Sequence, residues 1–225
     1  MTREPLSSMR LPKPAGYYGE TRANVIDELP LPLGRVLDVG CGEGGADVPL
    51  RARGATWISG IEILPEPAAR AAERYDEVEV GDAIAALERV TGRFDTICCY
   101  DVLEHLVDPA ALARSLLEVS SPEARLHVSL PNARHYSLVR DLVLRGTFGY
   151  RDWGHRDSTH LRWFTRRDVT LLLEDTGWRV VGTVPSALHR LRELKLPVPA
   201  RVVNGVAGEF FSRTWYVLAC APGGA

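Results

Sequence analysis

The hydrophobic positions of the chain form short apolar runs that alternate with segments of helical periodicity. Runs at residues 36–39, 56–62, 78–82, 94–101 and 126–130 end at glycines or polar residues, which is typical of buried strands. The segments 47–53, 65–75, 84–90 and 109–119 between them predict helices. Because helices that join parallel strands cover both faces of a sheet, the alternation predicts a mostly parallel α/β fold.

The pattern changes after residue 130. Residues 131–164 are polar, aromatic and charged, and we interpret them as a functional insertion on the substrate side, because so long a break inside a compact domain is uncommon. A helix is predicted at 165–176, where Thr165 and Asp168 have capping-box spacing and Gly177 follows. Strands are predicted at 178–184 and 211–219. A variable insertion at 185–209 lies between them.

The N-terminal residues 1–32 predict an arm followed by a short lid helix. Three prolines lie within the first 16 residues, and residues 23–29 form an amphipathic stretch. Tyr17 and Tyr18 precede that stretch, and either a lid over a ligand or ordinary packing explains them. With 225 residues, the chain is expected to fold as one domain spanning residues 1–225.

A glycine-rich turn follows the first predicted strand. Gly40, Gly42 and Gly45 satisfy the G-x-G-x-x-G spacing of dinucleotide sites, with Glu62 about 20 residues further on. A nicotinamide-dependent oxidoreductase is therefore one alternative. Asp38 argues against it, because a carboxylate two residues before the first glycine would repel a pyrophosphate. That carboxylate favours a ligand with positive charge.

The run V-L-D-V-G-C-G-E-G resembles the first motif of class I S-adenosylmethionine-dependent methyltransferases. The resemblance extends from residue 17 to residue 218. It implies a Rossmann-like, seven-stranded, mostly parallel sheet with helices on both faces and an antiparallel last strand. It also implies S-adenosylmethionine as the cofactor and S-adenosylhomocysteine as its product.

Acidic residues stand at the carboxyl ends of four successive predicted strands, the edge where open parallel sheets bind ligands. The resemblance implies that the first-motif turn contacts the methionine end of the cofactor, through Asp38, Gly40 and Gly42. Glu62 accepts from the ribose hydroxyls, and Asp82 from the adenine amino group. Asp101 opens the signature D-V-L-E-H-L, which lines the reaction pocket. The further residues expected at the cofactor are Tyr18, Arg22, Ile63, Ala83 and Leu103.

The insertion carries a second group of motifs. Residues 129–132, 146–150 and 157–165 resemble a branch of small-molecule methyltransferases from polysaccharide and natural-product gene clusters, whose members commonly read D-x-T-H-L-R-F-F-T. Trp163 replaces the first phenylalanine, and residues 152–156 depart from the branch pattern. The residues expected to contact the substrate are Tyr17, Asn132, Arg162 and Trp163.

Methyl transfer to a neutral hydroxyl requires a base, and histidine is the side chain best poised near neutral pH. His160 is the first candidate because it lies in the branch motif, and His155 is the second, while His105 is expected to shape the pocket wall. For each, a structural hydrogen bond to backbone is the alternative. We expect O-methylation of a natural-product, sugar or anionic acceptor. N-methylation, which needs only alignment and exclusion of water, and a non-catalytic cofactor-binding module are the alternatives.

The charge and composition of the chain limit the classes of ligand and partner that we expect. Eight arginines against three aspartates in and beside the insertion favour an acceptor with an anionic group, with a solvated helix face as the alternative. The formal net charge of -2 disfavours nucleic acid. No apolar stretch approaches the roughly 20 residues of a membrane span, so a cytoplasmic enzyme is expected. The four cysteines form no C-x-x-C pair, and no metal site is predicted. The pattern carries no indication of oligomeric state.

Overall fold

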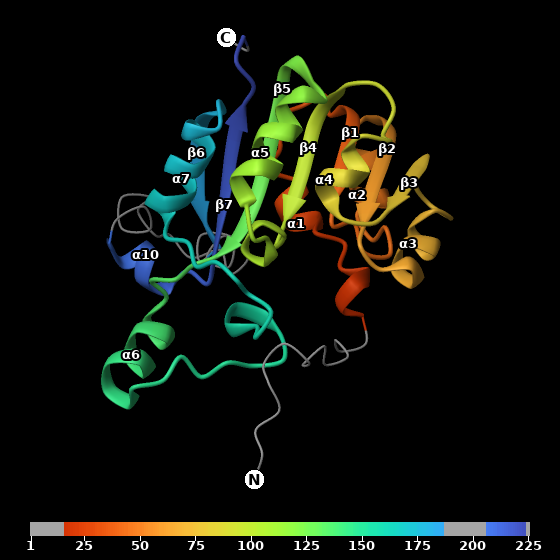
Figure 1. Cartoon of the computed structure of the whole chain (residues 1–225). Coiled ribbons are helices and arrows are strands. Elements are labelled where there is room, and N and C mark those ends of the chain that lie inside the picture. The colour runs from red at the N-terminus through yellow and green to blue at the C-terminus, as the bar shows by residue number, and fades with distance from the viewer. Residues whose placement is uncertain (1–15, 187–205, 224–225) are drawn as a thin grey trace.

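The computed structural model describes residues 16–186 and 206–223, and a seven-stranded sheet of order β3-β2-β1-β4-β5-β7-β6 forms its centre (Figure 1). Five strands are parallel: β1 (Gly34–Val39), β2 (Ala55–Glu62), β3 (Glu77–Val80), β4 (Phe94–Tyr100) and β5 (Ser120–Pro131). β7 (Thr214–Cys220) runs antiparallel between β5 and β6 (Arg179–Pro185). The predicted mostly parallel sheet with an antiparallel last strand is confirmed.

Helices cover both faces of the sheet, and the helices on each face pack against the sheet through a separate cluster of buried apolar side chains. One layer consists of α1 (Ala23–Ile26), α2 (Asp47–Ala52) and α3 (Pro65–Ala71). The other consists of α4 (Ala83–Leu87), α5 (Pro109–Glu118) and α7 (Arg166–Asp175). None of the helices in the described ranges is long and apolar enough to cross a membrane.

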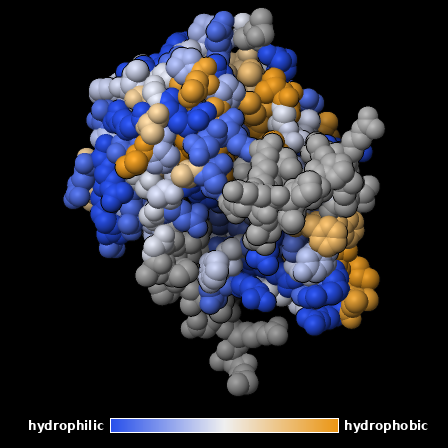
Figure 2. All heavy atoms as spheres, turned by 180° about the vertical axis from the view of Figure 1, so that it is seen from behind, coloured by the Kyte–Doolittle hydropathy of each residue, from blue (hydrophilic) through white to orange (hydrophobic). Residues whose placement is uncertain are grey.

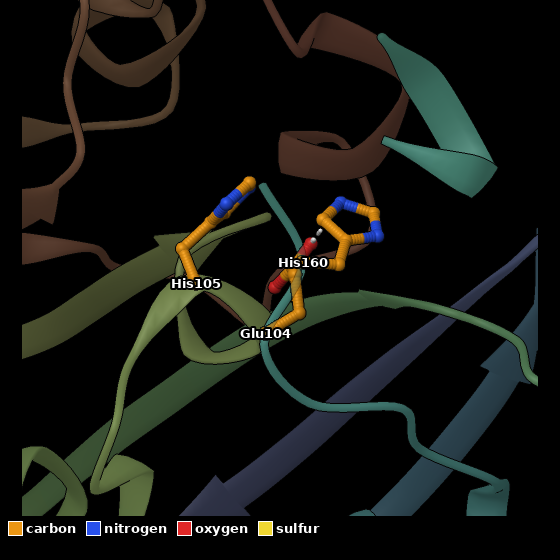
Figure 3. A group of neighbouring side chains, drawn as sticks. All are labelled: Glu104, His105 and His160. Atoms are coloured by element: carbon orange, nitrogen blue, oxygen red, sulfur yellow. Dashed lines mark ion pairs between the residues drawn. The ribbon is translucent and has the colours of Figure 1, made fainter. Parts of the chain in front are cut away.

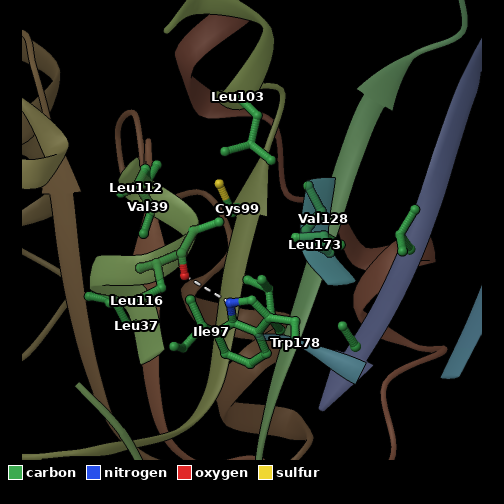
Figure 4. Close-up of a cluster of buried hydrophobic side chains, with 14 of the residues drawn as sticks. Leu37, Val39, Ile97, Cys99, Leu103, Leu112, Leu116, Val128, Leu173 and Trp178 are labelled. Carbon is green, nitrogen blue, oxygen red and sulfur yellow. Dashed lines mark hydrogen bonds between the residues drawn. The ribbon is translucent and has the colours of Figure 1, made fainter. Parts of the chain in front are cut away.

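The core on the α5 and α7 side is built around Trp178, which is 2% exposed. Its ring packs near Ile97 and Leu116 (Figure 4), and its indole Nε1 donates to the carbonyl oxygen of Ala113 at 2.8 Å. A buried indole N–H needs such an acceptor. The bond therefore ties the start of β6 to α5.

Several boundaries differ from the predicted ones. β5 begins at Ser120 and not at residue 126, because Ser120 and Arg125, on either side of Pro122, both pair with β4. Phe211 ends α10 (Val206–Phe211), so the last strand starts three residues later than predicted, at Thr214. Helix α7 has the predicted capping box. Most of the arm at 1–16 and of the variable insertion at 185–209 lies outside the described residues.

The insertion contains a helix that the hydrophobic pattern did not reveal. α6 (Tyr136–Arg145) follows β5, with His135 as its N-cap, and the 3-10 turn η4 (Gly154–Arg156) comes later. Both lie beyond the carboxyl ends of the parallel strands (Figure 1). In the missed helix Leu138 and Asp141 are buried, whereas Leu142, Val143 and Leu144 are exposed to solvent.

Candidate active site

The glycine turn after β1 has a shape that side chains would not allow. Gly40 and Gly42 have φ of +74° and +56°. A Cβ on Gly42 would lie 2.3 Å from the carbonyl oxygen of Tyr18. That carbonyl accepts from the backbone N–H of Glu43 at 2.8 Å. The 3-10 turn η2 (Tyr17–Gly19) is therefore held directly against the glycine turn.

The side chain of Tyr18 lies near two carboxylates, those of Glu62 and Asp157. Burial raises the pKa of its hydroxyl, and the negative charges of Glu62 and Asp157 add to that rise. Those two carboxylates belong to the end of β2 and to the insertion. The predicted lid position of Tyr18, between the glycine turn and the insertion, is thus compatible with the geometry.

Asp38 lies in β1 just before the turn and is 5% exposed. The hydroxyl of Tyr75 donates to its Oδ2 at 2.7 Å. Burial raises the pKa of Asp38 to about 6, while the Tyr75 hydrogen bond and the charge of Arg22 oppose the rise. The carboxylate is ionised at neutral pH, and it suits a cationic group. Tyr75 follows α3, and its role could not be seen in the sequence because nothing local pairs it with Asp38.

Glu62 ends β2 and is 5% exposed. Its two carboxyl oxygens accept from the backbone N–H groups of Gly42, at 2.9 Å, and Leu64, at 3.0 Å. Glu62 thereby links the glycine turn to the end of the neighbouring strand. The next side chain, Ile63, is 62% exposed and so lies on the open side of this edge.

Asp82 follows β3 and is the N-cap of α4, where its Oδ1 accepts from Ile84 N at 3.0 Å and Ala85 N at 3.3 Å. The carboxylate is exposed, and Ala83 is the first helical residue. Gly81 N donates to the carbonyl of Glu62 at 2.9 Å, so the two acidic positions are adjacent. The predicted contacts of Asp82 with the adenine and of Ala83 with the cofactor stay predictions.

Asp101 follows β4 with φ of +55°. Its Oδ2 accepts from Arg22 Nη1 at 2.7 Å, and its Oδ1 accepts from the hydroxyl of Ser129 at 2.8 Å. Arg22 precedes α1 and therefore reaches across the edge to β4. Leu103, also a predicted cofactor residue, is 1% exposed and belongs to the core, and its contact with the cofactor stays a prediction.

The D-V-L-E-H signature and the branch motif of the insertion meet at one point (Figure 3). The carbonyl oxygen of Glu104, in η3 (Leu103–His105), accepts from Leu161 N at 2.8 Å and Arg162 N at 3.0 Å. The rings of His105 and His160 lie 4.8 Å apart, edge to face. Two predicted catalytic histidines, distant in sequence, are thus brought together.

Glu104 is the functional candidate that the sequence reasoning did not single out. It is 1% exposed, and within the described part of the chain neither carboxyl oxygen has a hydrogen-bond partner. Its Oε1 lies 4.0 Å from His160 Nε2. Burial raises the pKa of Glu104 well above its usual value and lowers the pKa of His160 to about 4. His160 is therefore uncharged at neutral pH.

Ligand atoms of Glu104, His105 and His160 all lie within 4.8 Å of one another. One carboxylate oxygen and two imidazole nitrogens can hold a transition-metal ion, and the same groups can move a proton. The Nδ1 of His105 is already placed by Thr159, whose hydroxyl lies 3.1 Å away and donates in turn to Asp157. The predicted absence of a metal stays a prediction.

His155 lies outside this cluster. Its Nε2 is 2.6 Å from the carbonyl oxygen of Asn132, and its ring packs against His135 at 5.2 Å. This is the structural arrangement that the sequence left as the alternative for each histidine. The amide of Asn132 is likewise occupied, because it donates to the carbonyls of Glu209 and Ser212.

The other predicted substrate residues lie at different depths. The ring of Trp163 is between the two histidine positions, 5.6 Å from His160 and 6.3 Å from His155. Arg162 is exposed, and its Nη2 donates to the carbonyl of Val107. Tyr17 begins η2 at the glycine turn. Their contacts with a substrate stay predictions.

Comparison with known proteins agrees with this geometry. Residues 16–183 match a family model described as a methyltransferase domain. The ubiquinone biosynthesis O-methyltransferase of Xylella fastidiosa is 32% identical over 181 residues, which cover 73% of this chain and 72% of the relative.

Solved structures show the same fold at low sequence identity. A SAM-dependent methyltransferase from Archaeoglobus fulgidus has a TM-score of 0.60 at 16% identity, with 84% of this chain and 86% of that chain covered. A methyltransferase from Mesorhizobium loti has a TM-score of 0.59 at 16% identity, with 90% and 98% covered. The nicotinamide alternative depended on glycine spacing alone and is set aside. The chain belongs to the methyltransferase domain family and is a class I S-adenosylmethionine-dependent methyltransferase.

Proposed function

We propose that this enzyme methylates a hydroxyl oxygen of a small anionic molecule, with His160 as the general base. The observation that supports this proposal is the cluster of Glu104, His105 and His160, which follows Asp101 at the ligand-binding edge of the sheet. It places an uncharged imidazole with a buried carboxyl neighbour beside the cofactor side of the fold. The name of the Xylella relative, an O-methyltransferase, agrees with oxygen as the acceptor atom.

The residues along the edge fit the cofactor, which supplies a methyl group on a positively charged sulfur. Asp38 offers a buried carboxylate to the ammonium group, and in the glycine turn Gly40 is exposed, so a ligand can approach the backbone there. Glu62 already accepts two backbone N–H groups, but a carboxylate has lone pairs for further donors such as ribose hydroxyls. We assign the adenine end to Asp82.

His160 takes the proton of the acceptor hydroxyl in this proposal. Its pKa of about 4 keeps the ring unprotonated at neutral pH. When the ring takes this proton and becomes positively charged, a carboxylate at Glu104, whose Oε1 lies 4.0 Å from Nε2, stabilises it, because opposite charges at this distance favour each other. Glu104 thus gives the base a partner at the moment of proton transfer.

We propose a small acceptor in the cytoplasm. Nucleic acid is disfavoured as the acceptor, since the net charge of -2 provides no general attraction for phosphate backbones. The arginines of the insertion support an anionic group on the acceptor. A natural product or sugar derivative with a free hydroxyl has the required chemistry.

The test measures S-adenosylhomocysteine formation on a panel of catechol carboxylates and sugar phosphates and on matched amines. We expect turnover on hydroxyl acceptors, and His160→Gln should lower kcat about 100- to 10,000-fold while calorimetry shows unchanged S-adenosylhomocysteine affinity. His105→Gln alters only the pocket wall, so it should lower kcat less than His160→Gln does. With S-adenosylmethionine kept saturating, the kcat/KM of wild type for the acceptor should fall only as the pH approaches about 4.

Three results would contradict the proposal. Preference for the amines would indicate N-methylation. Cofactor binding without turnover on any acceptor would indicate a binding module. Activity lost to a chelator and restored by a divalent ion would show that Glu104, His105 and His160 hold a metal and do not act through a free base.

A further inference from the structure

A polar cavity lies in the insertion, between α6 and residues 151–156. Its volume is about 340 Å³. Among its lining residues, five are arginines and only Asp141 is acidic. The arginines are Arg140, Arg145, Arg151, Arg156 and Arg213. Figure 2 shows this part of the molecule from behind, where hydrophilic residues gather next to an apolar edge.

Asp141 is already shared by three of these arginines. It lies 2.9 Å from Arg140, 3.3 Å from Arg145 and 2.9 Å from Arg156. The guanidinium groups of Arg140 and Arg156 lower the pKa of Asp141 to about 2. One negative charge therefore faces three positive ones, and the cavity wall stays electropositive.

Arg151 and Arg213 add two further positive charges. Both are exposed, and neither side chain forms an ion pair or hydrogen bond with any other residue in the described ranges. Arg151 precedes η4, whereas Arg213 precedes β7, so the fold brings them to one cavity from distant segments. The nearby Glu209 pairs instead with Arg134 and Arg166.

We infer that this cavity binds a phosphate or diphosphate group of the methyl acceptor. Guanidinium forks match phosphate oxygens with paired N–H donors. A single carboxylate on the ligand would leave most of the positive charge uncompensated, whereas a diphosphate matches it better. The inference rests on the proposed function, because the bound anion is taken to be part of the acceptor.

A row of aromatic rings lies between the cavity and the reaction centre. His155 lines the cavity and contacts Trp163, and Trp163 contacts His160 on its other side. Phe148 packs against Trp163 with ring centroids 4.7 Å apart. In this inference, an acceptor that holds its phosphate at the arginines extends along Trp163 toward His160, which is 8% exposed.

The test is calorimetric titration of the full chain with inorganic pyrophosphate at about 0.15 M salt, where weak surface attraction is screened. We expect binding in wild type and at least tenfold weaker binding in Arg151→Gln/Arg213→Gln. The matched control, Arg74→Gln, removes an exposed arginine near α3 and should bind as wild type does. Arg151→Lys/Arg213→Lys should be intermediate, since it keeps the charge but loses the fork.

Equal pyrophosphate affinity in wild type and the double glutamine variant would overturn the inference, as would no binding at millimolar pyrophosphate. A second arm uses phosphatidylglycerol vesicles, and binding to these without binding to pyrophosphate would also overturn it, because the group would then be a lipid headgroup. Titration with S-adenosylhomocysteine should give the same affinity in all variants. The pyrophosphate result does not depend on turnover, so failure of the proposed O-methylation is recognised separately.

Discussion

Replacing Gly42 by alanine tests whether the glycine turn needs close approach of backbone. The new Cβ would lie 2.3 Å from the carbonyl oxygen of Tyr18, which already accepts from Glu43 N. Either η2 must move away or the turn must shift. Both changes alter the surface on which we place the methionine end of the cofactor.

The size of the effect has two parts. A non-glycine residue at positive φ costs about 1 to 2 kcal/mol, and φ is +56° here. Relieving the contact with Tyr18 adds about 1 to 3 kcal/mol, as overpacking does elsewhere. We therefore expect Gly42→Ala to lower the free energy of unfolding by about 3 kcal/mol and S-adenosylhomocysteine affinity at least tenfold.

Gly54→Ala is the matched control. Gly54 also has positive φ, +83°, but a Cβ there meets nothing within 4 Å. This variant should show only the conformational cost and an unchanged affinity. Urea unfolding gives the two free energies, and calorimetry gives the two affinities. If Gly42→Ala loses no more stability than Gly54→Ala, or binds S-adenosylhomocysteine as tightly as wild type, the close-approach argument is refuted.

Two other variants probe the hydrogen bonds of Asp38 and Trp178. Because the pKa of Asp38 is about 6, S-adenosylhomocysteine affinity should weaken up to about tenfold per pH unit below that value. Tyr75→Phe removes the donor to the ionised form and should move this midpoint up by about one unit; superimposable calorimetric pH profiles would contradict it. Trp178→Phe breaks the bond to Ala113 and leaves a small void, so urea unfolding should show a loss of about 2 kcal/mol with affinity unchanged. A loss below about 0.5 kcal/mol would mean that this bond does not stabilise the core.

The sequence predicted the elements whose signals are local. Apolar runs located the parallel strands, and the Thr165 and Asp168 box located α7. The positions of Asp38, Glu62 and Asp101 at strand ends followed from the same runs, because parallel strands present their carboxyl ends at one edge. The family motifs added the cofactor, and comparison with relatives confirmed it.

The tertiary structure decided which distant side chains meet. His160 reaches His105 because Leu161 and Arg162 donate to the carbonyl of Glu104. Glu104 has no periodic signal of burial, yet the packing of the insertion over η3 removes its carboxyl from water. His155 instead bonds to the carbonyl of Asn132.

The sequence by itself thus determined the sheet, the edge at which the acidic strand ends gather and the methyltransferase family, since strand patterning and a contiguous motif are properties of neighbouring residues. Only the tertiary structure separated His160 from His155, paired Tyr75 with Asp38, and gathered Arg151 and Arg213 around one cavity. These contacts join segments far apart in the chain, and their partners are set by packing, which no local pattern encodes.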